Sequence, residues 1–514
     1  MQVASIVIIE LGSQYTKLIE RTLRELGYRS AVLPPRRAEQ WIRANNPRAI
    51  ILSGSKHSVH DAYAPKVMGD ILDLGIPVLG ICYGMQLISK MLGGMVGSAV
   101  EERDYGSTDI SMSIKDGVLC GMPHTTAVWA SHGDTVTSLP TGYSIAARPA
   151  GRQGVSAMVR DDGRVWGVQF HPEVKQTPLG ARMLENFVSG VAGCVRDWRP
   201  EDMISEIRSR LQADTGGQSS LLAFSGGVDS TTLASIASTV LGSNLRAVCI
   251  DGGQLRDGEI EEIRQNAEFA NVSLSVVSAE DYFASLFVGN ERVGNPPDPE
   301  TKRKLFRRGY TNRLNLAHQS FSPVFFIQGT LAPDMIESGL TGGDVIKTHH
   351  NTSVVLDGCR SLHPFAHLFK YEVRALAEIL ELPAQVRDRK PFPGPGLFVR
   401  IIDGWPTRER LEILRWADKQ VDGMLKEHGV LDDIDQLVVG LSCAKSVGTK
   451  GDSRAYGYPI VVRGVKTVDY MTAVGYQLPA EVRKIICSEL TKHSKITRVW
   501  FDETDKPPGT VEFE

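Results

Sequence analysis

The sequence predicts an α/β protein with two doubly wound parallel-sheet domains and a smaller C-terminal α+β domain. Short apolar runs bounded by polar or glycine residues recur as far as Gln328, which is typical of buried strands. Amphipathic stretches lie between these runs, and such alternation builds βαβ units in a parallel sheet with helices on both faces. The strict alternation ends near Leu397. A chain of 514 residues is long enough for roughly three domains of about 150 residues each.

The first predicted domain covers residues 1–195. Its strands are predicted from apolar runs at Val3–Ile9, Ala49–Leu52, Pro77–Ile81 and Val165–Phe170. Helices are predicted from the amphipathic stretches Gln14–Leu26 and Met85–Leu92. The segment Arg196–Gly217 that follows is polar and contains Arg199-Pro200 and a glycine pair. We interpret it as a linker with one helix at Glu201–Leu211.

The second predicted domain covers residues 196–396. Its predicted strands are Ser219–Phe224, Leu245–Asp251, Val272–Val277 and Val324–Gln328. Its predicted helices are Asp229–Leu241 and Gly258–Ala270. Five prolines between Pro364 and Pro395 then interrupt the pattern. They mark the end of this domain.

The third predicted domain covers residues 397–514. It has one strong helical pattern, Thr407–His428, followed by strand-like runs at Val438–Leu441, Pro459–Arg463 and Thr497–Phe501. Because strands and helices do not alternate strictly here, the pattern predicts an α+β arrangement.

Composition excludes several classes of protein. Lys and Arg total 57 and Asp and Glu total 60, so a formal net charge of -3 makes a general nucleic-acid binder a poor candidate. No run approaches the ~18 apolar residues of a membrane span. The 7 cysteines form no CxxC pair, which argues against a disulfide framework or a cysteine-rich zinc site. The N-terminus favours a first strand over a signal peptide. We therefore expect a cytoplasmic protein that binds neither nucleic acid nor membrane.

A candidate nucleophile, Cys82, stands where an apolar strand meets a helix, in the string PVLGICYGMQ. A helix N-terminus favours a thiolate, and turn N–H groups can stabilise an oxyanion. The string GVQFHPEV places His171 at the end of another strand, with Glu173 two residues on. His171 would take the thiol proton and Glu173 would orient the imidazole. A lone cysteine is more often a core thiol, but this pairing favours catalysis.

These two strings resemble those of class I glutamine amidotransferase domains, and the resemblance covers about 190 residues. It implies that Cys82, His171 and Glu173 hydrolyse glutamine through a thioester. It also implies a set of oxyanion and glutamine-binding positions: Gly54, Ser55, Tyr83, Gln86, Ser131, His132 and Gly133. The family's oxyanion motif continues Gly-Pro after the residue at Gly54, whereas this chain has Ser55-Lys56.

A second candidate site lies in LLAFSGGVDSTTLA (221–234), an apolar strand followed by a glycine-rich turn and a helix. N–H groups of Gly226 and Gly227 with the hydroxyls of Ser225 and Ser230 would cradle a phosphate. Asp229 beside a phosphate suggests an accompanying Mg²⁺, which Asp229 would ligate. The string lacks GxxxxGK[ST], so it is not a Walker A loop.

The complete string resembles the PP-loop of N-type ATP pyrophosphatases. The resemblance implies that residues 225–230, Val228 included, hold the pyrophosphate of ATP, and that AMP is transferred to a substrate oxygen. Asp251, in CIDGG, falls where that family contacts the adenine nucleotide.

The whole chain resembles the glutamine-hydrolysing GMP synthase family. The order of domains fits, as do GTLAPDMIES (329–338), IKTHHN (346–351), PFPGPGL (391–397) and KSVG (445–448). The resemblance implies that ATP adenylates O2 of xanthosine 5'-monophosphate (XMP) and that ammonia from glutamine then displaces AMP. It also implies a homodimer through the C-terminal domain and a set of acceptor-nucleotide residues: Arg303, Lys445, Lys506 and Glu512.

The chain departs from that family beside the predicted nucleotide sites. Ser55, His363, Tyr371, Lys390 and Lys450 replace the family's usual residues. Two alternatives therefore stay open. One is a divergent paralogue that aminates a related or modified purine nucleotide. The other is a non-catalytic regulatory homologue, against which the intact thiol and phosphate-loop strings argue.

Overall fold

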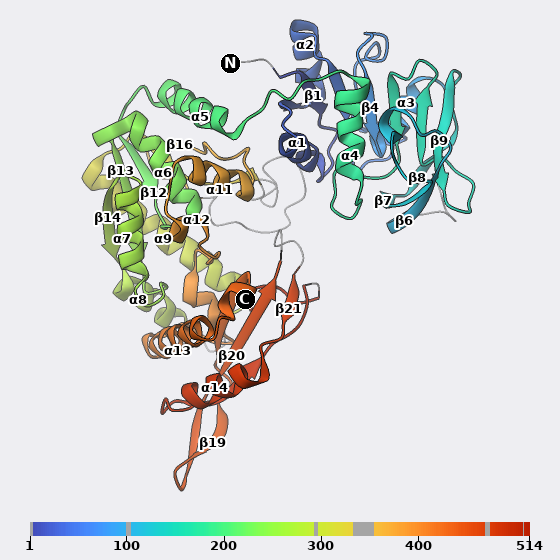
Figure 1. The fold of residues 1–514 in the computed structure, drawn as a ribbon. Coiled ribbons are helices and arrows are strands. Elements are labelled where there is room, and N and C mark those ends of the chain that lie inside the picture. The colour runs from blue at the N-terminus through green and yellow to red at the C-terminus, as the bar shows by residue number, and fades with distance from the viewer. Residues whose placement is uncertain (1–3, 99–103, 292–296, 333–353, 468–472, 507) are drawn as a thin grey trace. The chain divides into compact units, whose positions relative to one another are not determined.

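A computed structural model describes residues 4–98, 104–291, 297–332, 354–467, 473–506 and 508–514 (Figure 1). The described residues divide into two compact units, one up to Met203 and one from Ile204 onward. The start of the strand predicted at Val3–Ile9, most of GTLAPDMIES and all of IKTHHN lie outside the described residues. Among the helices that are described, none is both long enough and apolar enough to cross a membrane.

In the described part of the first unit, nine strands form one sheet in the order β2-β1-β3-β4-β11-β10-β9-β6-β7. These strands are β1 (Ile6–Ile9), β2 (Ser30–Leu33), β3 (Ala49–Leu52), β4 (Val78–Ile81), β6 (Asp104–Met112), β7 (Thr125–His132), β9 (Tyr143–Pro149), β10 (Ala157–Arg160) and β11 (Val165–Val168). Pairing is parallel from β2 to β11 and antiparallel from β11 to β7. Two further strands, β5 (Met95–Ser98) and β8 (Asp134–Ser138), pair with each other. The predicted parallel sheet is therefore present, with an antiparallel extension that the sequence analysis did not predict.

Helices cover both faces of this sheet. They are α1 (Thr16–Glu25), α2 (Pro35–Asn45), α3 (Tyr83–Met91) and α4 (Gly180–Glu185). Alternate residues of β1 enter different cores: Ile6 and Ile8 pack with Ile19 of α1, whereas Val7 packs with Ile42 of α2. This period of two is what a strand buried on both faces requires. The arrangement brings the carboxyl ends of β3, β4 and β11 to one edge.

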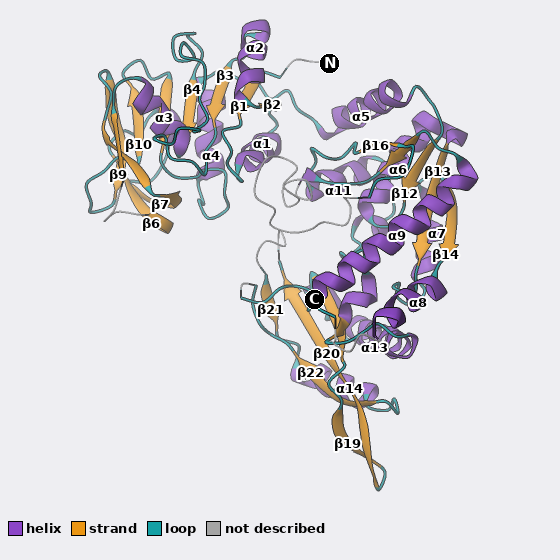
Figure 2. Cartoon of the chain, turned by 180° about the vertical axis from the view of Figure 1, so that it is seen from behind, coloured by secondary structure: helices purple, strands orange, loops and turns teal. Residues whose placement is uncertain are grey.

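In the second unit, the described strands of one sheet are all parallel and run in the order β14-β13-β12-β15-β16. They are β12 (Ser220–Ala223), β13 (Leu245–Asp251), β14 (Ser273–Ser278), β15 (Phe325–Ile327) and β16 (Arg360–Leu362). The associated helices are α5 (Pro200–Thr215), α6 (Val228–Leu241), α7 (Glu259–Phe269), α8 (Glu280–Glu291), α9 (Pro299–Phe321), α11 (Lys370–Ile379) and α12 (Ala384–Arg387). Figure 2 shows α9 as one long helix that crosses a face of this sheet. In this order β13 lies on one side of β12 and β15 on the other. The strand order therefore reverses at β12, and such a switch point is where open α/β sheets usually bind their ligands.

The C-terminal part of this unit contains a mixed sheet. Its described strands are β17 (Ile401–Ile402), β18 (Gln436–Ser442), β19 (Ser446–Lys450), β20 (Ser453–Lys466), β21 (Val474–Tyr476) and β22 (Ile496–Phe501). Its helices are α13 (Arg408–Glu427) and α14 (Ala480–Leu490). β20 pairs with β18, β19 and β21 antiparallel and with β22 parallel. This is the predicted α+β arrangement.

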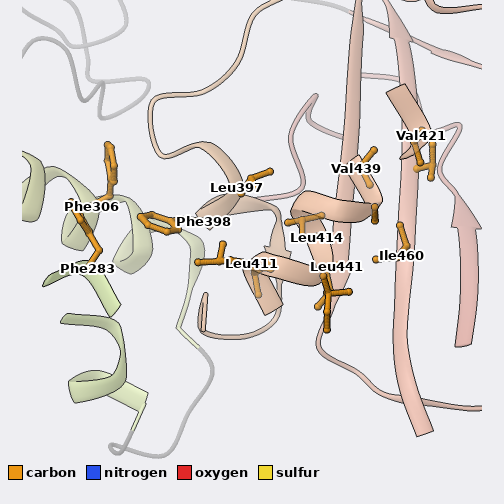
Figure 3. Packing of buried hydrophobic residues seen from close by; sticks show 14 of the residues in the cluster. Phe283, Phe306, Leu397, Phe398, Leu411, Leu414, Val421, Val439, Leu441 and Ile460 are labelled. Carbon is orange, nitrogen blue, oxygen red and sulfur yellow. The ribbon is translucent and has the colours of Figure 1, made fainter. Parts of the chain in front are cut away.

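One continuous core joins the two parts of the second unit (Figure 3). Phe283 of α8 and Phe306 of α9 face Phe398, with ring centroids 5.7 Å and 6.1 Å from the Phe398 centroid. The same core continues to Leu414 of α13 and Val439 of β18. Residue 396, where we predict a domain boundary, lies two residues before Phe398, so this boundary falls between two rings of the cluster and the third.

Candidate active sites

Cys82 occupies a sharp turn between β4 and α3. Its backbone angles are φ 52° and ψ -106°, which is costly for a residue with a Cβ and is typical of functional turns. The flanking glycines make the turn possible: a Cβ on Gly80 would lie 2.6 Å from the carbonyl carbon of Gly84, and one on Gly84 would lie 2.5 Å from Leu52 O. Tyr83 is the first residue of α3, so its N–H has no intrahelical acceptor. The turn thus presents a buried thiol beside a helix N-terminus.

His171 and Glu173 lie just beyond the end of β11. His171 Nδ1 is 2.8 Å from Glu173 Oε1, and both side chains are buried. Burial alone would lower the pKa of His171, but the Glu173 carboxylate and the hydrogen bond with Cys82 outweigh it and raise that pKa well above its ordinary value. The Tyr15 ring and the imidazole pack edge to face, with their ring centroids 5.0 Å apart. The arrangement favours an imidazolium that lies between the Cys82 sulfur and the Glu173 carboxylate.

The predicted oxyanion residues Gly54 and Ser55 follow β3, and Gly54 lies against the imidazole of His171. A Cβ on Gly54 would lie 3.2 Å from His171 Cε1, so the segment passes close to the ring. Ser55 Oγ accepts a hydrogen bond from the His57 N–H at 3.2 Å. The backbone φ of Ser55 is not positive, so this position does not require glycine. The replacement of glycine by Ser55 therefore introduces no backbone strain.

The predicted glutamine-binding residues fall into two groups. Ser131, His132 and Gly133 lie at the end of β7, and Ser131 O is 3.9 Å from Cys82 Sγ. Gln86 is buried in α3, where its Nε2 donates to Asp134 O at 2.8 Å. The Tyr83 hydroxyl donates to Pro65 O at 2.7 Å, and burial raises its pKa to about 12. The Tyr83 hydroxyl is thus engaged away from the site, and the group that Tyr83 can contribute there is its backbone N–H.

The phosphate loop links β12 to α6. Gly226 has φ +68°, and a Cβ there would lie 2.8 Å from Ile263 Cγ1, so glycine is required. The Ser225 and Ser230 hydroxyl oxygens are 3.2 Å apart, and Ser225 Oγ accepts from the Gly227 N–H at 3.4 Å. Val228 begins α6. These donors converge at a helix N-terminus, which suits an anion.

Asp229 has one paired and one unpaired carboxylate oxygen. Its Oδ2 accepts from Lys370 Nζ at 2.6 Å, whereas its Oδ1 is buried and has no hydrogen-bond partner among the described residues. Lys370 begins α11, and the sequence analysis did not predict this role for it. Asp251 ends β13, where its Oδ1 accepts from the Gly253 N–H at 3.0 Å.

The predicted acceptor residues make several kinds of contact. Arg303 in α9 donates to Glu514 O. Lys445 lies over the Tyr458 ring, 5.0 Å from its centroid. Lys506 pairs with Ala473 through the backbone. Glu512 accepts two hydrogen bonds at 3.1 Å from the buried Arg400 and one at 2.8 Å from Gln436; these contacts of Glu512 were not predicted.

Comparisons with known proteins match both ends of the chain and its whole length. The family described as "Glutamine amidotransferase class-I" matches residues 7–191, and "GMP synthase C terminal domain" matches residues 423–513. A "GMP synthase [glutamine-hydrolyzing]" of Thermus thermophilus is 41% identical over 514 residues, covering 99% of this chain and 100% of its own. One of Syntrophomonas wolfei is 38% identical over 519 residues, covering 100% of both chains.

The chain belongs to the glutamine-hydrolysing GMP synthase family. Among solved structures, a glutamine amidotransferase from Thermotoga maritima matches over 37% of this chain and 98% of its own. It is 17% identical, with a TM-score of 0.32.

Two departures from the family's usual residues are lysines that bind main-chain carbonyls. Lys390 donates to Leu431 O and Ile434 O, and burial lowers its pKa. Lys450 donates to Thr491 O at 3.1 Å, directly after α14, where a cation is favourable. Both lysines therefore stabilise the C-terminal part of the unit.

Two further departures, His363 and Tyr371, have contacts of their own. His363 Nδ1 lies 2.9 Å from Thr330 Oγ1, and burial lowers its pKa. The Tyr371 ring stacks on Phe369 at a centroid distance of 6.3 Å. Tyr371 immediately follows Lys370, whose Nζ is 2.6 Å from Asp229 Oδ2.

Proposed function

We propose that this GMP synthase family member aminates XMP to GMP, with glutamine as nitrogen source and ATP as activator. It is an ATP-dependent ligase. What carries the proposal is that one chain, related to the family over its full length, pairs a buried Cys82–His171–Glu173 site with a phosphate loop at a helix N-terminus. The two sites correspond to the two chemical half-reactions.

In the first half-reaction the Cys82 thiolate attacks the side-chain carboxamide of glutamine. The backbone N–H groups of Tyr83 and Ser55 would bind the oxyanion. His171 gives its proton to the departing ammonia, which leaves a thioester on Cys82, and then takes a proton from the water that hydrolyses it. Glu173 holds the imidazole through Nδ1 in both steps. Glutamate and ammonia are the products.

In the second half-reaction O2 of XMP attacks the α-phosphorus of ATP, pyrophosphate leaves, and ammonia then displaces AMP from C2. We assign the pyrophosphate to the turn 225–230 and the adenine nucleotide to the end of β13, at Asp251. The buried, unpaired Asp229 Oδ1 fits a ligand of Mg²⁺. That cation would neutralise charge on the leaving pyrophosphate. Lys370, 2.6 Å from Asp229, would add a second positive charge.

We assign the acceptor nucleotide to Arg303, Lys445, Lys506 and Glu512. Arg400 and Gln436 hold the Glu512 carboxylate in a fixed position, which suits recognition of purine N–H edges. The cations suit a phosphate.

We also propose a cytoplasmic homodimer that associates through residues 397–514. All seven cysteines lie among the described residues and are free, as is usual in a reducing compartment. Val447 of β19, Tyr456 of β20 and Trp500 of β22 are exposed apolar residues on neighbouring strands of one sheet. Sedimentation of the purified chain tests the dimer, and replacement of Tyr456 by Lys should weaken it.

The acceptor is tested by a substrate panel with ammonia as donor. We expect pyrophosphate release with XMP and none with inosine or adenosine monophosphate. Preference for another purine nucleotide would favour the divergent paralogue, and no release with any nucleotide would favour a regulatory homologue. The structure gives Lys390 and Lys450 main-chain partners, so these two departures do not by themselves argue for a changed acceptor.

A further inference from the structure

Gln169 is a second buried side chain, besides His171, that contacts the sulfur of Cys82. Its Nε2 lies 3.7 Å from Cys82 Sγ, and the residue is 3% exposed. An amide that turns its nitrogen to the sulfur donates to a thiolate, whereas its oxygen would repel one. The direction of this amide therefore decides what Gln169 does in the site.

A chain of hydrogen bonds that begins at a main-chain carbonyl fixes that direction. Asp134 O can only accept, and Gln86 Nε2 lies 2.8 Å from it, which assigns the nitrogen of Gln86. The same nitrogen donates to Gln169 Oε1 at 3.3 Å. Since the oxygen of Gln169 is engaged by Gln86, its nitrogen faces Cys82. The reversed amide would place the two amide nitrogens against each other in a buried site, so the second hydrogen of Gln86 Nε2 would face a donor instead of an acceptor.

The same series of hydrogen bonds extends to the segment after β3 that contains the predicted oxyanion residue Ser55. Ser58, three residues after Ser55, donates from Oγ to Asp134 Oδ2 at 2.5 Å. Asp134 thus links the segment that contains Ser55 to the Gln169 amide through hydrogen bonds. Its main-chain oxygen orients Gln86 while its carboxylate holds Ser58.

We propose that Gln169 is a catalytic residue of glutamine hydrolysis that donates a hydrogen bond to the Cys82 thiolate. Gln86 and Asp134 are positioning residues that hold its amide in the donating direction. The inference rests on the proposed role of Cys82 as nucleophile. When water attacks the thioester, the carbon–sulfur bond breaks and its electron pair returns to sulfur. At that moment His171 has just taken the proton of the water, and Gln169 stabilises the leaving thiolate.

The test replaces Gln169 by Met, which has similar length and no donor. Glutamate release by the full chain is measured with ATP and XMP present, and alkylation of Cys82 by iodoacetamide is followed across pH. We expect kcat to fall roughly 10- to 100-fold with little change in KM, as loss of a hydrogen bond to a charged group implies. The alkylation profile should move to higher pH. A matched control, Gln153→Met on the exposed loop before β10, should leave both unchanged.

A wild-type kcat and alkylation profile in a folded Gln169→Met protein would overturn the inference. If that variant does not fold, Gln169→Glu decides. It is nearly isosteric, and its carboxylate should repel the thiolate and move alkylation further towards high pH; an unmoved profile overturns the inference. Cys82→Ala separates the two hypotheses: glutamate release that persists without Cys82 contradicts the proposed function, whereas Cys82-dependent release that is indifferent to Gln169 contradicts only this inference.

Discussion

The thiol site of the first unit and the phosphate loop of the second balance their charges differently. The His171–Glu173 pair is sealed from solvent, with side chains 4% and 0% exposed, whereas the Lys370–Asp229 pair is 36% and 28% exposed. Glu173 Oε2 also has no hydrogen-bond partner among the described residues, but its charge is matched by the imidazolium. The comparison indicates that folding completes the thiol site, whereas substrate completes the phosphate loop.

The largest test of this contrast is Cys82→Ala. We expect glutamine-dependent amination to fall to background while ammonia-dependent amination persists, because we assign the acceptor chemistry to the other unit. Both rates are measured as GMP formation. Equal loss of both in a folded protein would contradict a model with two separate sites.

Asp229→Ala tests the phosphate loop, the more exposed of the two sites. We expect pyrophosphate release with XMP and ammonia to fall roughly a thousandfold, since removal of a cation ligand costs several kcal/mol of transition-state stabilisation. Alkylation of Cys82 in the same variant serves as the control and should be unchanged. Wild-type pyrophosphate release would mean that the turn 225–230 is only structural.

The raised pKa of His171 predicts how the stability of the sealed site depends on pH. A group whose pKa is higher in the folded than in the unfolded state stabilises the fold below its unfolded value, about 6.5, and loses this contribution as pH rises through the folded value. The unfolding free-energy difference between wild type and His171→Gln should therefore shrink as pH rises. Urea titrations at several pH values measure it, and a constant difference would contradict the charged pair.

Lys390→Met should destabilise the second unit by about 1–2 kcal/mol, because two carbonyls lose a charged donor. We expect KM for XMP to change less than about twofold, because Lys390 contacts main-chain carbonyls of the protein and none of the residues assigned to the acceptor. Lys419→Met is the control: its ion pair with Asp257 is exposed, and its loss should cost less than about 0.5 kcal/mol. A large change in KM with unchanged stability would place Lys390 in the acceptor site.

The smallest expected effect is that of Ser55→Gly. The residue does not adopt a positive φ, so restoring the family's glycine should change kcat for glutamate release less than about threefold. A larger gain would show that the Ser55 side chain limits the oxyanion segment.

The sequence was sufficient for features that repeat or stand together in a motif. The short apolar runs that alternate with amphipathic stretches predicted both parallel sheets, and the strand–turn–helix strings around Cys82 and Ser225 predicted both candidate sites. It was insufficient for α9, because only a few residues of this charged helix are buried, Lys302 and Phe306 among them, and its apolar period is weak. Lys370 and Gln169 were not predicted, because each acts on a residue that is distant in sequence.

The aromatic cluster of Phe283, Phe306 and Phe398 has a consequence for anyone who divides this protein. If the protein were expressed as two fragments divided at residue 396, Phe283 and Phe306 would be separated from Phe398. Each fragment would then expose an apolar surface to water, and large exposed apolar patches promote aggregation. The two fragments should therefore be recovered together by co-expression and precipitate when made alone. The parts of the chain before and after residue 396 should therefore be exchanged between family members only as one piece. A recombinant that takes the two parts from different relatives should lose this aromatic packing.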